Sequence, residues 1–280
     1  MKDTITKHGN STIQHGPYND RTYLMKLDPN YTSEIIPFID KLCNKENYGK
    51  SFAVISQEVL PEFLRNGYKI EACVPDFYST DNAGYFLGKY YNSSREKINN
   101  SKLKPLEAMY PRETKKAAPA ITPGLPAGYT IKQVPPEGCS EMAILYSKVF
   151  ADYPFPITDP DYLKEIYGSL TDFIGIYHGS TLVAVGSGEK DTEYKKAEVT
   201  DIAVDPEYRG KKLSYLLIDA VEQNMKHNNY RICYTIARLP SIGMNRAFLA
   251  GGYLFGGTLF NNTRIGTGIE SMNVWYKHIR

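Results

Sequence analysis

A short basic turn carries the clearest chemistry in the sequence: Arg209, Gly210, Lys211 and Lys212 stand between an apolar strand and an amphipathic helix. The first amides of a helix have no intrahelical partner and, together with the helix dipole, they favour an anion. Gly210 lets the backbone approach a ligand closely, and the three cations add positive potential. The turn is therefore typical of a pyrophosphate site, although a plain solvated turn can have the same residues.

Composition and motifs exclude several other kinds of chemistry. The 280 residues carry 33 basic and 31 acidic side chains, which argues against a dedicated nucleic-acid binder. No stretch approaches the ~20 apolar residues of a membrane helix, and no signal region is expected at the start. The four cysteines form no CxxC pair, the histidines lack metal spacing, and Walker A and GxGxxG motifs are absent. We expect a cytoplasmic protein with free thiols, no metal, no nucleic-acid partner and no membrane partner.

Strands and helices are predicted to alternate around the basic turn. Strands at Glu198–Val204 and Ile232–Ala237 flank a helix at Leu213–Met225, which requires a parallel pair with a crossover helix. A hairpin at Phe173–Ser187 requires antiparallel pairing as well. The expected fold is therefore α/β, with a mixed sheet covered by helices. The other elements are expected at Tyr129–Val134, Glu141–Phe150, Asp161–Tyr167, Met244–Ala250, Leu254–Leu259 and Glu270–Tyr276.

Residues 92–126 form a polar and then Pro- and Ala-rich stretch that is typical of a linker. Loops of this length are uncommon inside compact domains. We therefore expect an N-terminal α/β domain at 1–91, a linker at 92–126 and a second domain at 127–280. The alternative is one domain with a long surface loop.

The element order and the basic turn resemble the GNAT superfamily of acetyl-CoA-dependent N-acetyltransferases. The pyrophosphate loop of that superfamily begins with Gln or Arg and has Gly or Ala at its fourth and sixth positions. Here Arg209 opens the loop, whereas Lys212 and Ser214 occupy the two positions for small residues. The resemblance to this loop is therefore partial.

Four further segments resemble the beta-lysine N-acetyltransferase family: HGPYNDR (15–21), YPFPI (153–157), SIGMN (241–245) and MNVWYK (272–277). The resemblance implies acetyl transfer from acetyl-CoA to the N6 amine of beta-lysine, (3S)-3,6-diaminohexanoate. The product, N-epsilon-acetyl-beta-lysine, would serve as an osmolyte. The partner would be a small-molecule amine, and a homodimer is compatible with this reading.

The resemblance also implies catalytic roles in the strand Glu198–Val204. Glu198 is expected to be the general base, because a lysine-like amine with a pKa near ~10.4 must lose a proton before it can attack. Side chains alternate along a strand, so Glu198 and Val204 are expected on one face and Asp201, the alternative base, on the other. A plain surface carboxylate is the other reading of Glu198.

Acetyl-CoA is expected to bind along the end of this strand and the turn that follows. The Val204 amide would donate to the oxyanion. Asn245 would hydrogen-bond CoA or merely begin a helix. Phe248 occupies the place of the Tyr that serves many GNAT enzymes as general acid, and a phenyl ring cannot donate a proton. The expected cofactor-binding residues are Ile202, Ala203, Val204, Arg209, Gly210, Lys211, Lys212, Leu213, Ser214 and Asn245; the expected acceptor-binding residues are Asp152, Tyr153, Phe155 and Asp201.

The N-terminal part repeats short strings of the C-terminal part. LDPNY (27–31) resembles VDPEY (204–208), and FLRNGY (63–68) resembles FLAGGY (248–253), with similar elements between them. We therefore predict a shortened, degenerate copy of the same fold, without the basic turn and without a CoA site. Chance similarity of common α/β elements is the alternative.

Two other functions remain open from the sequence. The first is a GNAT acetyltransferase for another amine, such as a peptide, a protein lysine or an aminoglycoside. The second is a non-catalytic CoA-binding sensor, which the departures at Lys212 and Phe248 would allow.

Overall fold

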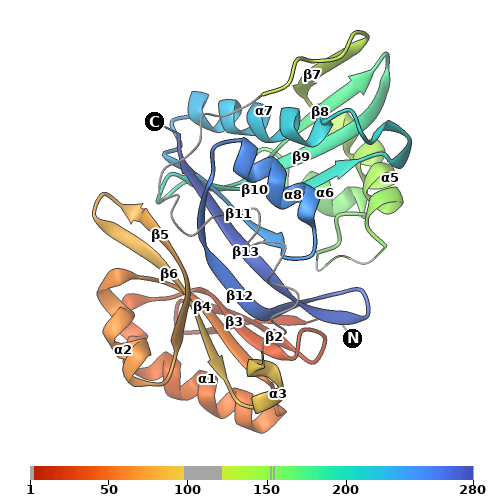
Figure 1. Cartoon of the computed structure of the whole chain (residues 1–280). Helices are drawn as coiled ribbons and strands as arrows, with labels where there is room; N and C mark the ends of the chain where they lie inside the picture. The colour runs from red at the N-terminus through yellow and green to blue at the C-terminus, as the bar shows by residue number, and fades with distance from the viewer. Residues whose placement is uncertain (1–2, 98–121, 152, 154, 280) are drawn as a thin grey trace. The chain divides into compact units, whose positions relative to one another are not determined.

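The strand that leads into the basic turn belongs to a mixed sheet in the computed structural model, which describes residues 3–97, 122–151, 153 and 155–279 (Figure 1). The chain forms two units that interleave in sequence. The first takes Met1–Lys104 and Gly256–Val274, and the second takes Pro105–Phe255 and Trp275–Arg280. The domain limits expected from the sequence, at residues 91 and 127, stay a prediction.

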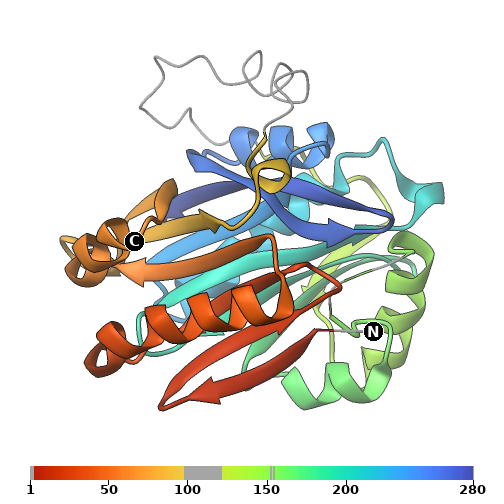
Figure 2. The same ribbon diagram turned by 90° about the horizontal axis from the view of Figure 1, so that it is seen from below.

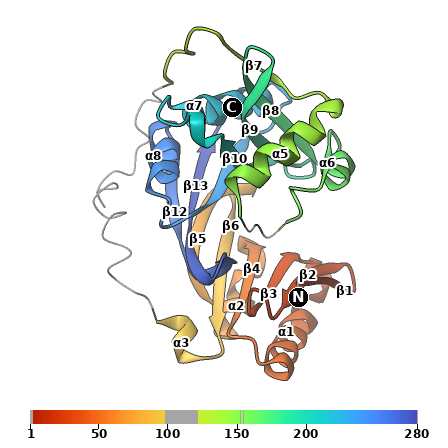
Figure 3. The same cartoon turned by 90° about the vertical axis from the view of Figure 1, so that its right-hand side faces the viewer.

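The strands of the second unit follow the order β7-β8-β9-β10-β11, antiparallel from β7 to β10 and parallel between β10 and β11. The expected mixed α/β fold is confirmed. Helices α5 and α6 lie on one side of these strands, and α7 and α8 lie on the other (Figure 3). The elements are β7 (Tyr129–Gln133), α5 (Cys139–Val149), α6 (Pro160–Ile166), β8 (Thr171–His178), β9 (Thr181–Asp191), β10 (Lys196–Val204), α7 (Leu213–His227), β11 (Ile232–Arg238) and α8 (Ile242–Ala250).

The two faces of β9 and β10 pack against different helices. On one face α7 lies so close that a Cβ on Gly188 would be 2.9 Å from Met225 Cε. On the other face the buried Tyr146 of α5 belongs to a core with Val185 and Ala203. The face toward α5 is the one that carries the acidic residues described below.

A β-bulge interrupts β10 after Thr200, where the register against β9 shifts and Asp201 adopts a left-handed φ of 50°. Ser187 lies two residues before Glu189, which is opposite Glu198 in the register, so Ser187 and Glu189 are on the same face of β9. Ser187 Oγ donates a hydrogen bond to Asp201 Oδ2 (2.9 Å). Asp201 therefore joins the face of Glu198, and the register places Val204 on the opposite face. The regular alternation expected from the sequence was wrong here, because the extra residues of a bulge reverse the side-chain order.

The strands of the first unit follow the order β1-β2-β3-β4-β6-β5-β12, with β3 and β4 parallel. Helix α1 lies along these strands (Figure 2). The β1–β2 hairpin was not expected, and α3 occupies residues expected to begin the linker, whose residues 98–121 lie outside the described part. The elements are β1 (Thr4–His8), β2 (Ser11–Gly16), β3 (Arg21–Lys26), α1 (Thr32–Glu46), β4 (Lys50–Ser56), α2 (Leu60–Arg65), β5 (Lys69–Ser79), β6 (Asn82–Tyr90), α3 (Ser93–Glu96), β12 (Leu254–Ile265) and β13 (Gly268–His278).

The element order of both units supports an internal repeat. In each unit two antiparallel pairings precede a parallel one, in β1-β2-β3-β4 and in β8-β9-β10-β11. A helix of 15 residues joins the parallel strands in both. The Phe63 and Tyr68 rings lie 5.0 Å apart at 71°, and those of Phe248 and Tyr253 lie 5.1 Å apart at 73°. We propose that the first unit is a shortened copy without counterparts of β7, α5 and α6.

Candidate active site

The basic turn ends in an open helix start. A 3-10 turn, Pro206–Tyr208, follows β10, and α7 begins at Leu213. Asp205 fixes the turn by accepting hydrogen bonds from the Glu207 amide (3.1 Å) and Lys148 Nζ (2.9 Å). In the part of the chain that the structure describes, no side chain caps the first amides of α7. These amides can therefore bind an anion.

Lys212, directly before α7, takes a left-handed conformation with φ 58° and ψ 28°. Glycine adopts this conformation without a Cβ clash, which gives a reason for a small residue at this loop position. The Lys212 side chain is exposed, so it leaves the loop unfilled. Lys212 therefore departs from the motif at a cost in backbone energy, while the loop keeps its shape.

Replacing Lys212 separates its backbone cost from its charge. Lys212→Gly is expected to be more stable than Lys212→Ala by about 1 kcal/mol, because only glycine relieves the left-handed strain. Both variants lose the same charge and should raise the KM for acetyl-CoA equally. Chemical denaturation and steady-state kinetics measure the two effects. Equal stability of the two variants would contradict the strained conformation.

The parallel strands β10 and β11 separate beyond Glu198. Their pairing covers three residue pairs and ends at Glu198 and Tyr234, although β10 continues to Val204. The Asp205 amide donates to Val183 O on β9 (2.9 Å). Since successive amides of a strand point to opposite edges, the Val204 amide points toward the side of β11. This geometry supports the role expected for the Val204 amide.

Three carboxylates gather on the face of the sheet toward α5. Glu198 lies directly opposite Glu189 in the antiparallel register. Asp201 is buried and accepts hydrogen bonds from Tyr153 Oη (2.5 Å) and Ser187 Oγ (2.9 Å). The structure thus brings together three residues singled out in the sequence, Glu198, Asp201 and Tyr153.

This crowding changes the acidity of all three carboxyl groups. Loss of solvation and the charge of Asp201 raise the pKa of Glu198 to about 7. Hydrogen bonds from Tyr234 and the Ile236 amide lower this pKa and so limit the rise. Loss of solvation and then the charges of Asp201 and Glu198 raise the pKa of Glu189 well above its ordinary value. Loss of solvation also raises the pKa of Asp201, while its hydrogen bonds oppose the rise. A carboxyl group with a pKa near neutrality suits a general base.

The raised pKa of Glu198 predicts a pH-dependent stability difference. The folded protein prefers protonated Glu198, so the carboxylate destabilises the fold as pH rises from its ordinary pKa of 4.5 to about 7. The free energy of unfolding of Glu198→Gln should therefore rise relative to that of the wild type across this pH window, by about 2–3 kcal/mol in total. Above about pH 7 the difference should stay constant. Urea denaturation of both proteins between pH 4 and 8 measures the difference. A difference that does not change with pH would contradict the shift.

Asn245 is fully buried, and its side chain is used within the second unit. Its Nδ2 donates to the carbonyl oxygens of Arg238 (2.9 Å) and Ser241 (2.8 Å), and its Oδ1 accepts from Trp275 Nε1 (2.9 Å). Of the two roles considered for Asn245, this geometry supports the structural one. Phe248 is buried as well, so this position supplies no general acid.

The remaining acceptor residues are placed only in part. Asp152 lies outside the described residues, and the side chain of Phe155 is 38% exposed. Sequence reasoning missed Glu189 and Tyr234, both neighbours of Glu198. The signal that could have found Glu189 is the β9–β10 register. Both strands extend beyond the expected limits at Ser187 and Glu198, and Thr192–Lys195 alone connect them.

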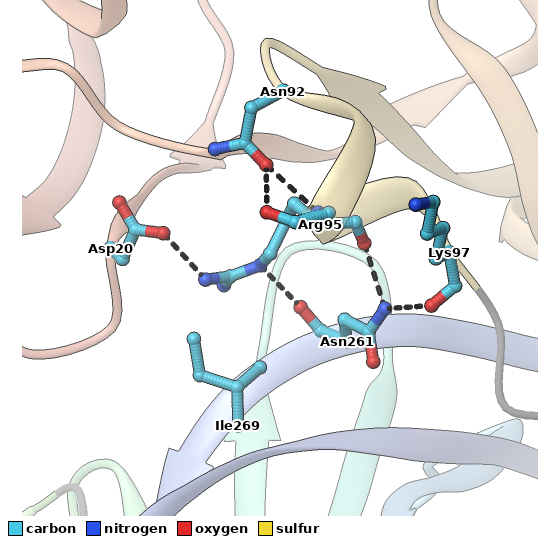
Figure 4. A pocket seen from close by; sticks show the side chains of 7 residues that line it. Asp20, Asn92, Arg95, Lys97, Asn261 and Ile269 are labelled. Atoms are coloured by element: carbon cyan, nitrogen blue, oxygen red, sulfur yellow. Dashed lines mark hydrogen bonds and ion pairs between the residues drawn. The ribbon is translucent and has the colours of Figure 1, made fainter.

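A separate pocket of about 260 Å³ lies in the first unit (Figure 4). Its Arg95 is buried and donates to Asp20 Oδ2 (2.9 Å) and to the carbonyl oxygens of Asn19 and Asn261 (both 2.8 Å). These bonds fix α3 to its neighbours, so Arg95 serves the fold. The pocket is lined by Asp20, Asn92, Ser94, Arg95, Lys97, Asn261 and Ile269.

The described ranges hold neither a metal-binding cluster nor a membrane-crossing helix. Within them, no group of three or more His, Cys, Asp or Glu side chains is arranged to hold a metal ion. Nor does any helix of these ranges combine the length and apolar character needed to cross a membrane.

Comparisons with known proteins find acetyltransferases among the relatives of this chain. Residues 140–248 match the model of the Acetyltransferase (GNAT) family. The chain is 36% identical, over 275 residues and 98% of both chains, to the beta-lysine N(6)-acetyltransferase of Methanococcus maripaludis. It is 38% identical over 151 residues to that of Methanosarcina mazei, covering 54% of this chain and 56% of the relative. The ribosomal-protein-S18-alanine N-acetyltransferase structure from Escherichia coli aligns with a TM-score of 0.48 at 14% identity, covering 54% of this chain and 94% of its own.

The chain therefore belongs to the GNAT acetyltransferases and, within them, to the beta-lysine N(6)-acetyltransferase family. It is an N-acetyltransferase, and enzymes of this family use acetyl-CoA. The GNAT fold occupies the C-terminal half, and a β-rich region precedes it.

Proposed function

We propose that the protein transfers acetyl from acetyl-CoA to the N6 amine of beta-lysine, giving N-epsilon-acetyl-beta-lysine, a compatible solute. The observation that carries the proposal is the relative that matches 98% of this chain at 36% identity. The cluster formed by the carboxyl groups of Glu189, Glu198 and Asp201 supports it, because beta-lysine carries two ammonium groups that carboxylates can bind. The enzyme would act in the cytoplasm, without a metal, and a homodimer is compatible with this activity.

The basic turn would hold the pyrophosphate of acetyl-CoA. The open amides at the start of α7 would donate to phosphate oxygens, and Arg209, Lys211 and Lys212 would add charge from their exposed side chains. The gap between β10 and β11 would take the pantetheine arm. The acetyl carbonyl would then lie beside the Val204 amide.

In this mechanism Glu198 accepts the proton of the N6 ammonium, directly or through water. The neutral amine attacks the acetyl carbon, a C–N bond forms, and the Val204 amide stabilises the oxyanion. The C–S bond then breaks, and the extra proton on the nitrogen passes to the CoA thiolate or to solvent. A thiol with a pKa near ~8.5 is a tolerable leaving group, so buried Phe248 needs no replacement as general acid.

A thiol-release assay tests the proposal with beta-lysine, α-lysine and a lysine peptide as acceptors. The highest kcat/KM is expected for beta-lysine, with acetyl on N6 by mass spectrometry and NMR. Preference for the peptide would favour another amine as substrate. Acetyl-CoA binding without thiol release for any acceptor would favour a sensor.

A further inference from the structure

Glu189 is an ionisable group of this face that the mechanism leaves unused. It lies directly opposite Glu198 on the neighbouring strand, and Cβ atoms of such pairs are about 4.5–5.5 Å apart. Part of its side chain is open to solvent, although loss of solvation around the carboxyl group raises its pKa. Glu189 can therefore reach a molecule bound at Glu198.

Within the described ranges, no basic side chain is found to balance the three carboxyl groups. Like charges directly opposite each other destabilise a strand pair, and Asp201 adds a third charge. Among the described residues, the groups that shift the pKa values of Glu189, Glu198 and Asp201 include no Lys or Arg. The same residues show no metal-binding arrangement. An organic cation is the occupant that fits this charge.

A buried hydroxyl beside the carboxylates also points to a ligand. Tyr146 of α5 is 0% exposed, and its Oη has no hydrogen-bond partner among the described residues. Tyr146 packs in one core with Val185 of β9 and Ala203 of β10, on the face of the sheet that carries the carboxylates. Burial, and then the charges of Asp201 and Glu189, raise the pKa of Tyr146. Buried polar groups normally have a partner, and a bound polar molecule would supply one.

We propose that Glu189 is a specificity residue that binds the second ammonium group of a diammonium acceptor while the first lies at Glu198. The proposal rests on the acetyltransferase function proposed above. The reacting amine gives its proton to Glu198 and is neutral when it attacks, whereas the second amine stays protonated and needs a carboxylate. An acceptor with one ammonium group leaves Glu189 unpaired, so the site selects by charge.

Two acceptors that differ in one group test this selection. The compound 6-aminohexanoate is beta-lysine without its 3-amino group. Glu189→Gln is expected to raise the KM for beta-lysine about tenfold, the effect of losing roughly one charged hydrogen bond. It should leave the KM values for 6-aminohexanoate and acetyl-CoA within about twofold. Glu189→Asp keeps the charge and should retain most of the preference.

The control is Glu137→Gln, which removes a carboxylate from an exposed turn and should leave both acceptors unaffected. Equal changes for the two acceptors in Glu189→Gln would indicate a structural role and overturn the proposal. If the wild type acetylates 1,4-diaminobutane and not beta-lysine, the proposed function fails, and 1,4-diaminobutane against 1-aminobutane then tests Glu189. A wild-type preference for monoamines would overturn the inference.

Discussion

Glu198→Gln is expected to lower kcat at least tenfold and to leave the KM for acetyl-CoA unchanged, since general bases contribute about 10²–10⁴-fold. The amide keeps the shape of the carboxyl group but cannot accept the ammonium proton. Glu198 is well placed for this task, because loss of solvation and the charge of Asp201 raise its pKa to about 7. Stopped-flow and steady-state measurements of thiol release at pH 8 determine the loss.

Asp201→Asn is the matched comparison, because Asp201 is the alternative base on the same face. Its carboxylate already accepts hydrogen bonds from Tyr153 and Ser187, so we expect a smaller loss of kcat than in Glu198→Gln. A larger loss in Asp201→Asn would transfer the role of base to Asp201. Full activity in Glu198→Gln would remove Glu198 from the mechanism.

Asn245→Ala is expected to lower the free energy of unfolding by roughly 1–3 kcal/mol, because it removes the hydrogen bonds of a fully buried side chain, including the one accepted from Trp275 Nε1. Trp275 Nε1 loses its Asn245 acceptor. The carbonyl oxygens of Arg238 and Ser241 lose the Asn245 side-chain donor but keep the amides of Ser241 and residue 245 as donors. All of these partners lie in the second unit. Urea denaturation followed by Trp275 fluorescence measures the loss.

Asn228→Ala provides the control at the exposed end of α7, where the side chain bonds Asn224 O (2.9 Å). That variant should change stability by less than about 0.5 kcal/mol. The KM for acetyl-CoA separates the two roles of Asn245. Unchanged stability with a tenfold higher KM in Asn245→Ala would assign Asn245 to the cofactor.

Local sequence signals predicted the elements that carry the proposed acetyl-CoA site. The helix after the basic turn was expected from Leu213 and begins there, because apolar periodicity and the preceding turn act over a few residues. The left-handed conformation of Lys212 was not predictable in the same way. Only the path between β10 and α7 requires it.

The proposed acceptor site depends on strand register, which a single sequence specifies weakly. The bulge at Asp201 places its carboxylate on the same face as Glu198. No residue type in EVTDIAV (198–204) predicts this bulge. Glu189 faces Glu198 only because β9 and β10 extend to a short turn. These two features assemble the acidic face, and both arise from the pairing of strands.

The proposed N-terminal copy lacks the residues of the basic turn. Asp28 caps a 3-10 turn much as Asp205 does, accepting from the Asn30 amide (3.1 Å). Helix α1 then begins at Thr32, directly after that turn, so the segment equivalent to residues 209–212 is missing. A copy without this segment has no counterpart of the anion site.

The path of the backbone between the units limits how the protein can be divided. Residues 256–274 belong to the first unit and residues 275–280 to the second. The chain therefore passes from the second unit back to the first at residue 256, and returns to the second at residue 275. Within the first unit, the buried Lys50 donates to Phe260 O (2.7 Å), and β12 pairs with β5 at Gly257 and Ala72. A gene split at the linker would give a first fragment without β12 and a second fragment whose β12 has no β5. Such halves would fold only as complementing fragments, each supplying a strand that the other needs.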